Sequence, residues 1–426
     1  MRKLSLTVVL VSLLALPTAG ATAETEQIFG RYGDRVVQVR ILERGTGSKI
    51  TIGSGFFVSA EGHLVTNFHV LSELVHEPEK MRAEIVEEGG ATAPIEMLEF
   101  DVVHDLAIAR IVDTEGEKRR RSFLELATVP PSKGTRLFSL GNPYDLGSSI
   151  VEGTYNGLLE QSLYEKIHFT APINAGMSGG PAIDAEGKVV GINVSTAGNE
   201  LSFLVPAKYA ERLLAGVVAP GWAPSPNPVA VLTQQLIDNQ EMLTEHLLRA
   251  PLPQVSLGDY RMPGELGKFF KCWGATSPDN DDPYETVGHS CSTQDNIYVS
   301  RTLRAGTVSF NHTLLHSAEL NPLQFYTLYQ SRFAAWDDYA LSGSRQQVGL
   351  FVCESDYVAR GPSTFKTVLC LRGYKKLAGL YDAVFKAASL DSNREGVVTT
   401  MTMSGVSFEN AARLARQYLE AMAWSR

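Results

Sequence analysis

Cysteine is scarce in this chain and unevenly placed. The 426 residues contain four cysteines, and none of them lies in the first 271 residues. The N-terminal part therefore cannot be held together by disulfides, and the asymmetry indicates that the two parts of the chain are separate modules. The cysteines themselves are Cys272, Cys291, Cys353 and Cys370.

The chain also lacks a basic patch and any low-complexity tract. Its formal net charge is −9, and its lysines and arginines are scattered along the sequence. This distribution argues against binding a polyanion, so no nucleic-acid partner is expected. With 44% hydrophobic and 20% charged residues, the composition is that of a folded globular protein. The length predicts two or three domains.

Long apolar runs are missing after the first residues. Leu4 to Leu16 is apolar, follows Arg2 and Lys3, and precedes small residues ending at Ala23. The alternative to a signal peptide is a membrane anchor, but the run is shorter than the roughly 20 residues needed to cross a bilayer. We therefore predict a cleaved signal peptide at residues 1–23, no stable membrane anchor, and a periplasmic or secreted location.

The remaining chain divides at a proline-rich stretch. Residues 24–216 contain many short apolar or alternating runs separated by turn residues, which is typical of a β-sandwich or barrel. Residues 217–251 combine the proline-rich segment VVAPGWAPSPNP with an amphipathic helix pattern. Residues 252–426 mix strand and helix signals and are predicted to form an α+β domain.

The cysteines of this last domain are expected to form disulfides, because the protein is predicted to be exported. Cys272 with Cys291 and Cys353 with Cys370 is the simplest of three possible pairings. Zinc binding is the alternative, but closely spaced C-x-x-C pairs are missing.

The strongest chemical signal is a glycine-rich loop around one serine. Asn174 to Pro181 reads NAGMSGGP and lies between strand-like segments. The amides of Gly176 and Ser178 can point into one cavity and stabilise an oxyanion, so hydroxyl and oxyanion hole would come from one loop. The pattern G-x-S-x-G alone is only moderately specific, since a plain glycine–serine turn also fits it.

A nucleophilic serine needs a base, usually a histidine that a carboxylate holds in one tautomer. His69 follows the strand-like segment that starts at His63, and Asp105 opens the apolar run Leu106 to Ile111. Each residue taken singly is more often structural. Asp101 is the nearest rival acid, but it lies farther from that run, so we rank Asp105 above it.

Together, these segments resemble the trypsin-like serine proteases, specifically the HtrA-like (Do-like) bacterial branch, over about residues 35–210. The resemblance implies a double β-barrel with His69, Asp105 and Ser178 as a catalytic triad in the cleft between the barrels. It implies a serine endopeptidase that acts on protein or peptide substrates and needs no cofactor or metal. The matching segments, in the family's order, are residues 53–56, 66–70, 105–107, 140–143, 174–181 and 191–193.

Two departures from the family pattern stand out. In trypsins that are activated by cleavage, an aspartate before the serine forms a salt bridge with the newly cut N-terminus. Met177 occupies that position in this chain, so no such salt bridge is expected. The PDZ domain usual in HtrA-like proteins is not recognisable after residue 217, which leaves the oligomeric state open.

The resemblance also places the primary substrate pocket beside Thr170 and the segment Leu201, Ser202 and Phe203. No acid lies there, so we expect a neutral pocket for small or apolar side chains.

Two other functions compete with this interpretation. An α/β-hydrolase fits the serine motif, but that fold needs a helix after the serine and places its acid and histidine later in the chain. The second alternative is a catalytically inactive trypsin-fold binding protein.

Overall fold

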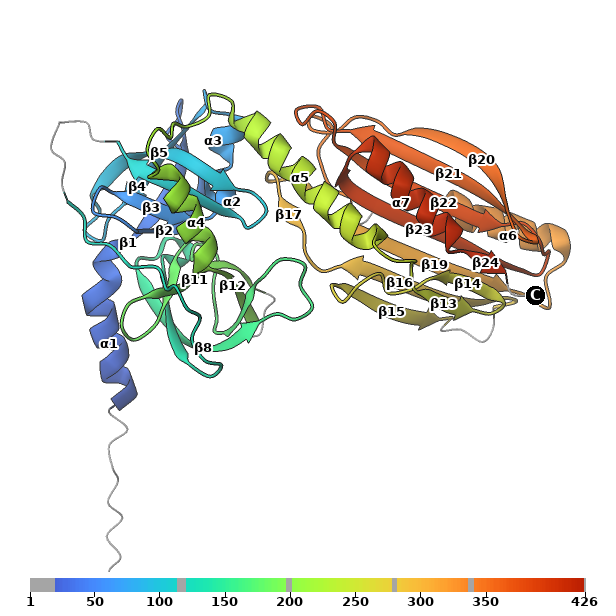
Figure 1. The fold of residues 1–426 in the computed structure, drawn as a ribbon, viewed down its shortest axis with the longest axis horizontal. Coiled ribbons are helices and arrows are strands. Elements are labelled where there is room, and N and C mark those ends of the chain that lie inside the picture. Colours follow the sequence, from blue (N-terminus) through green and yellow to red (C-terminus); the bar gives the residue numbers. More distant parts are fainter. Residues whose placement is uncertain (1–19, 113–119, 197–200, 278–281, 336–340, 425–426) are drawn as a thin grey trace, which may run out of the picture.

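The computed structural model describes residues 20–112, 120–196, 201–277, 282–335 and 341–424. Two closed β-barrels form one end of the molecule and a large antiparallel sheet forms the other, with helix α5 (Pro228–Leu248) running between them (Figure 1). Most of the predicted signal segment, residues 1–19, lies outside the described residues. Within the described part, no helix has both the length and the apolar character required to cross a membrane.

The first barrel has six antiparallel strands in the order β1-β2-β3-β6-β5-β4. Short helices α2 (Phe68–Leu71) and α3 (Glu73–His76) follow β3, and α3 contacts helix α5. Alternating apolar residues of these strands fill the barrel interior, as the alternation in sequence predicts. The strands are β1 Val36–Glu43, β2 Lys49–Phe57, β3 His63–Thr66, β4 Met81–Val86, β5 Thr92–Asp101 and β6 Leu106–Ile111.

The second barrel repeats this design with the order β10-β11-β12-β9-β8-β7. Helix α4 (Ala207–Val217) follows its last strand. Phe56 and Leu106 of the first barrel pack with Phe138 and Ile192 of the second in one buried cluster, so the barrels share a core at their junction. The strands are β7 Arg136–Gly141, β8 Ser149–Leu158, β9 Ile167–Thr170, β10 Pro181–Ile183, β11 Val189–Thr196 and β12 Leu201–Pro206. The predicted mainly-β double barrel is confirmed.

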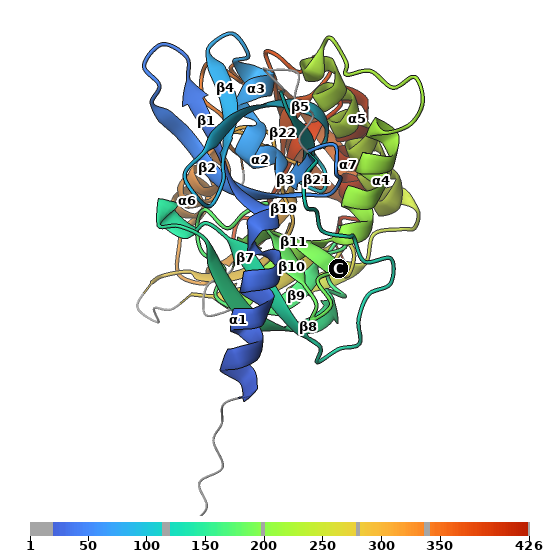
Figure 2. The ribbon, with the colours of Figure 1, turned by 90° about the vertical axis from the view of Figure 1, so that its left-hand side faces the viewer.

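The sequence did not predict helix α1 (Gly20–Tyr32), which lies against β8 (Figure 2). Ile28 and Tyr32 are buried in the cluster between the barrels, and the Tyr32 hydroxyl donates to the Glu186 carbonyl at 2.6 Å.

Helix α5 confirms the predicted amphipathic helix and connects the two halves. Its N-terminus is capped by Asn227, whose side chain accepts a hydrogen bond from the Ala230 amide at 3.1 Å. Leu232 and Leu236 join the core of the first barrel, and Leu243 and Leu247 join the core of the C-terminal domain.

The C-terminal domain is built on a seven-stranded sheet of order β15-β16-β19-β23-β22-β21-β20. Helices α5 and α7 (Phe408–Glu420) cover one face, and α6 (Pro322–Ala334) packs on the other. The predicted α+β class is confirmed. The strands of this domain are β13 Gln254–Leu257, β14 Tyr260–Pro263, β15 Phe270–Thr276, β16 Glu285–Thr293, β17 Ile297–Tyr298, β18 Arg304–Ala305, β19 Val308–His316, β20 Val352–Arg360, β21 Ser363–Gly373, β22 Tyr381–Ser389, β23 Glu395–Val406 and β24 Ala423–Trp424.

Both predicted disulfides are present. Cys272–Cys291 joins directly opposed residues of β15 and β16, and Cys353–Cys370 does the same for β20 and β21. Each bridge fastens an edge strand of the seven-stranded sheet to its neighbour. The zinc alternative is wrong for these residues, because all four sulfur atoms are used in disulfides.

Candidate active site

His69 and Asp105 meet at the edge of the first barrel. His69 lies in α2, directly after β3, and Asp105 lies in the turn between β5 and β6. The His69 Nδ1 atom is 2.6 Å from Asp105 Oδ2, and the His69 amide donates to Asp105 Oδ1 at 2.8 Å. Because the carboxylate contacts both the amide and Nδ1 of His69, it sets the orientation of the imidazole and leaves Nε2 without a bond to Asp105.

The turn that presents Asp105 has an unusual backbone conformation. Asp105 has a φ of 54°, in the left-handed region that most non-glycine residues avoid. Its carbonyl accepts hydrogen bonds from the Phe68 amide at 3.2 Å and from Asn67 Nδ2 at 2.8 Å. These bonds tie the turn to the residues before His69 and offset the cost of the strained conformation.

Asp101, the rival acid, has a different partner. Its carboxylate lies 2.6 Å from Nδ1 of His104 and accepts the amides of Val103 and His104, each at 3.0 Å. Burial alone would raise the pKa of Asp101, but the hydrogen bonds and charge of His104 outweigh it and lower the pKa. Among the two acids, only Asp105 contacts His69.

Ser178 lies in the predicted glycine-rich loop, which packs tightly against the first barrel. The Ser54 amide donates to the Ser178 carbonyl at 2.8 Å. A Cβ on Gly179 would lie 2.3 Å from the Ser54 carbonyl oxygen and 2.9 Å from the Asn67 amide. Gly179 also has a φ of 85°, so both space and conformation require glycine here.

This packing brings the serine loop and the histidine helix to the same place. A Cβ on Gly53 would lie 2.5 Å from a methyl group of Val70 and 3.2 Å from the Ser178 carbonyl oxygen. Val70 follows His69 directly, so His69 and Ser178 flank Gly53. Among the described residues, no hydrogen bond joins the Ser178 hydroxyl to the imidazole. In sites without substrate such bonds are often long.

The amides of the serine loop divide into two groups. Those of Met177, Gly179 and Gly180 donate to backbone carbonyls at 2.9–3.0 Å. Those of Gly176 and Ser178 donate to no acceptor within the described residues. Gly176 has a φ of 96°, and a Cβ on it would lie 2.4 Å from the Asn142 carbonyl oxygen. The two amides predicted to form an oxyanion hole are therefore available, as are those of Asn174 and Ala175, which also donate to no acceptor within the described residues.

The residues predicted for the substrate pocket lie on paired strands. Leu201 is opposite Thr170 in the β12–β9 pair, and Phe203 is two residues along on the same side. Phe203 lines a cavity together with His69. Ser202 faces the other way, is fully buried, and donates its hydroxyl to the Ala171 carbonyl at 2.7 Å. Phe203 therefore lies on the same cavity as His69, whereas Ser202 binds the segment that precedes the serine loop.

Tyr298 of the C-terminal domain was not predicted from the sequence. Its ring packs at a tilt on the His69 imidazole, with the ring centroids 5.6 Å apart. Burial in this contact raises the pKa of Tyr298. No local motif marks Tyr298, because its position depends on how two distant parts of the chain dock.

The double barrel, the His69–Asp105 pair and the glycine-rich serine loop are similar to the features of trypsin-like peptidases. Residues 53–192 match the family model described as trypsin-like peptidase domain. The relatives are DegP-like and Do-like proteases, in agreement with the HtrA-like resemblance of the sequence motifs. Over 188 residues the chain is 30% identical to a probable periplasmic serine endoprotease, DegP-like, of Bartonella henselae. This match covers 41% of this chain and 35% of that protein.

The chain is also 32% identical over 157 residues to Protease Do-like 5, chloroplastic, of Arabidopsis thaliana, covering 34% of this chain and 48% of that protein. A solved structure of Deg5 aligns at 26% identity over 47% of this chain and 96% of its own, with a TM-score of 0.41. The chain spans between 35% and 48% of the length of these two curated relatives.

Proposed function

We propose that this protein is a serine endopeptidase that hydrolyses peptide bonds through an acyl-enzyme intermediate, with residues 24–216 as its protease domain. The observation that carries the proposal is the 2.6 Å contact between His69 Nδ1 and Asp105 Oδ2, beside a serine loop packed on the same barrel. The trypsin-like family match supports it.

In the first half of the reaction, Ser178 Oγ attacks the carbonyl carbon of the scissile bond, and His69 Nε2 accepts the hydroxyl proton. Asp105 holds the proton on Nδ1, so that Nε2 is the basic nitrogen, and stabilises the imidazolium that forms. The C–N bond then breaks as His69 returns the proton to the leaving amine. The product is an ester between Ser178 and the acyl part of the substrate.

The amides of Gly176 and Ser178 bind the negatively charged oxygen of each tetrahedral intermediate. Such donors act without reorganisation because the loop already holds them in place. In the second half, water attacks the ester, His69 takes its proton, and Ser178 leaves with that proton. The mechanism uses neither a metal nor a cofactor.

We further propose that the substrates are proteins or peptides outside the cytoplasm. The predicted signal segment at residues 1–23 and the two disulfides of residues 252–426 support an exported protein. The DegP-like relative of Bartonella henselae is named as periplasmic. We place the primary pocket near Thr170, Leu201 and Phe203, where β9 and β12 carry no acid, which favours small or apolar side chains over Lys or Arg.

Cleavage of an unfolded protein substrate tests the proposal. Wild-type protein is expected to cleave it, and Ser178→Ala is expected to lower kcat/KM by at least about 10⁴-fold, because the nucleophile is lost. A folded wild type that cleaves no protein or peptide would instead indicate the inactive binding scaffold.

A further inference from the structure

A cavity of about 440 Å³ lies beside His69 and is lined by both halves of the molecule. The protease domain contributes His69, Asp105 and Phe203. The C-terminal domain contributes the segment from Gln294 to Tyr298, together with Arg304. The serine loop does not line it, but His69 does, so we infer that a substrate residue near the scissile bond reaches this cavity.

Tyr298 and Arg304 form one wall of the cavity. The Tyr298 ring packs on the His69 imidazole, and the Arg304 guanidinium lies over the Tyr298 ring, 4.2 Å from its centroid. A cation over an aromatic ring is held in a defined place at a modest energetic gain. The C-terminal domain therefore holds a positive charge, that of Arg304, close to the His69 imidazole, because Tyr298 contacts both side chains.

A buried carboxylate anchors this wall to the protease domain. The Asp295 side chain is 5% exposed and accepts hydrogen bonds from Lys166 Nζ at 2.6 Å, Ser162 Oγ at 2.8 Å and the Leu163 amide at 2.9 Å. Nearby, His76 Nε2 donates to the Val299 carbonyl at 2.7 Å. The protease domain thus supplies the partners of the buried Asp295 charge, which fixes this segment of the C-terminal domain against the protease domain.

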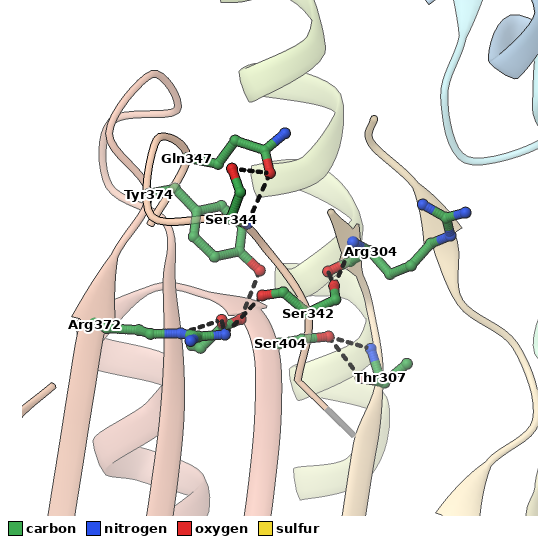
Figure 3. Close-up of polar contacts among 9 residues, drawn as sticks. Arg304, Thr307, Ser342, Ser344, Gln347, Arg372, Tyr374 and Ser404 are labelled. Carbon is green, nitrogen blue, oxygen red and sulfur yellow. Dashed lines mark hydrogen bonds and ion pairs between the residues drawn. The ribbon is translucent and has the colours of Figure 1, made fainter. Parts of the chain in front are cut away.

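The same wall is fastened to the C-terminal sheet from behind (Figure 3). The Arg304 amide donates to Ser342 Oγ at 2.7 Å, and Arg372 donates to the Ser342 carbonyl at 2.6 Å. Arg372 and Tyr374 both donate to the buried Asp382 carboxylate, at 2.8 and 2.6 Å. In Figure 3 the Arg304 side chain extends away from this network, so its backbone is held while its charge faces the cavity.

The other ionic groups facing the cavity already have partners. Lys166 pairs with Asp295, Glu165 with Lys208, and Asp105 with His69. Arg304 differs, because within the described residues its guanidinium donates hydrogen bonds only to the backbone carbonyls of Ser300 and Leu303, both through Nη1. Among the described residues no carboxylate lies within ion-pair distance of it.

We propose that Tyr298 and Arg304 of the C-terminal domain form a substrate subsite for an acidic side chain next to the scissile bond. A guanidinium presents N–H donors in a fixed plane that matches a carboxylate, and the aromatic ring beneath it holds that plane. The C-terminal domain then takes part in substrate selection by the protease domain. This inference rests on the proposed endopeptidase function.

A set of fluorogenic peptides tests it, with Asp or Glu exchanged against Asn or Gln at each of the positions flanking the cleaved bond. The full-length wild type is expected to prefer the acid at one of these positions by roughly tenfold in kcat/KM. Arg304→Gln is expected to abolish this preference, so that the acidic and the neutral peptides are cleaved with similar kcat/KM. Arg304→Glu is expected to prefer Lys or Arg at that position. Arg301→Gln, an exposed arginine of the same segment, is the matched control and keeps the acidic preference.

The rate of labelling of Ser178 by an uncharged fluorophosphonate shows independently whether each variant retains a folded, reactive site. An active wild type without any acidic preference, or a preference that survives in Arg304→Gln with normal labelling, overturns the subsite. Absence of both cleavage and labelling in the wild type would remove the proposed function itself, and the subsite with it.

Discussion

At the scale of single residues, the proposed site depends on which of two neighbouring acids, Asp101 or Asp105, contacts His69. Asp105 and Asp101 are four positions apart, and both contact a histidine Nδ1 at 2.6 Å, but the histidines differ. The sequence ranked Asp105 first because it opens an apolar strand, and the contact with His69 agrees with that ranking. The left-handed conformation of Asp105 could not be predicted, since it depends on hydrogen bonds from Asn67 and Phe68.

The two acids give a matched pair of variants. Asp105→Asn is expected to lower kcat by about 10³–10⁴-fold, because an amide no longer holds His69 in the tautomer with a basic Nε2. Asp101→Asn is expected to change kcat less than tenfold, because Asp101 contacts His104. Steady-state kinetics at one pH measures both. Equal losses in the two variants would show that Asp105 has no special role.

A buried histidine in the C-terminal domain predicts how stability depends on pH. His312 is fully buried; its Nε2 is 2.7 Å from the Pro263 carbonyl and its Nδ1 is 2.8 Å from Thr399 Oγ1. Burial lowers the pKa of His312 from 6.5 to about 4. Its stabilising contribution is therefore complete above pH 6.5 and is lost as the pH falls toward 4.

Between pH 7.5 and pH 5 this histidine is expected to lower the free energy of unfolding by about 2 kcal/mol. Urea denaturation at both pH values, compared with His312→Gln, isolates the effect, because the other titrating groups are shared. A pH dependence that is identical in the variant would contradict the assignment, whatever its absolute stability.

At the scale of elements, the serine loop is the part that the sequence predicted best. Its glycines mark positions where a side chain has no room, and the signal is local. The disulfide pairings followed from neighbouring strands, because Cys353 and Cys370 lie opposite each other across β20 and β21. The order of the seven-stranded sheet could not be predicted, because its pairing joins strands far apart in sequence.

Gly179 offers a test of how closely this loop must pack. Gly179→Ala is expected to reduce cleavage of a peptide substrate at least a hundredfold, because the new Cβ would collide with the Ser54 carbonyl and displace Ser178. Gly134→Ala is the matched control, since Gly134 has a similar φ of 93° with no atom within 4 Å of the added Cβ. Gly134→Ala is expected to cost about 1–2 kcal/mol of stability without loss of activity. Full activity in Gly179→Ala would show that the loop has no such constraint.

At the scale of the whole molecule, the C-terminal half is joined to the protease domain by packing and ionic contacts as well as by the connecting chain. Helix α5 contributes Leu232 and Leu236 to one core and Leu243 and Leu247 to the other. The segment at Asp295 then returns to the barrels beside His69. The sequence predicted separate modules and a helix between them, but docking depends on side chains that meet only in the folded protein.

The central claim is that two barrels bring a reactive serine to a histidine held by an acid. Mass spectrometry of the full-length protein after treatment with a fluorophosphonate tests it most directly. A single adduct on the peptide containing Ser178, lost in His69→Ala although the serine remains, is the predicted result. A wild type that stays unmodified while folded, or an adduct that forms equally fast without His69, would contradict it.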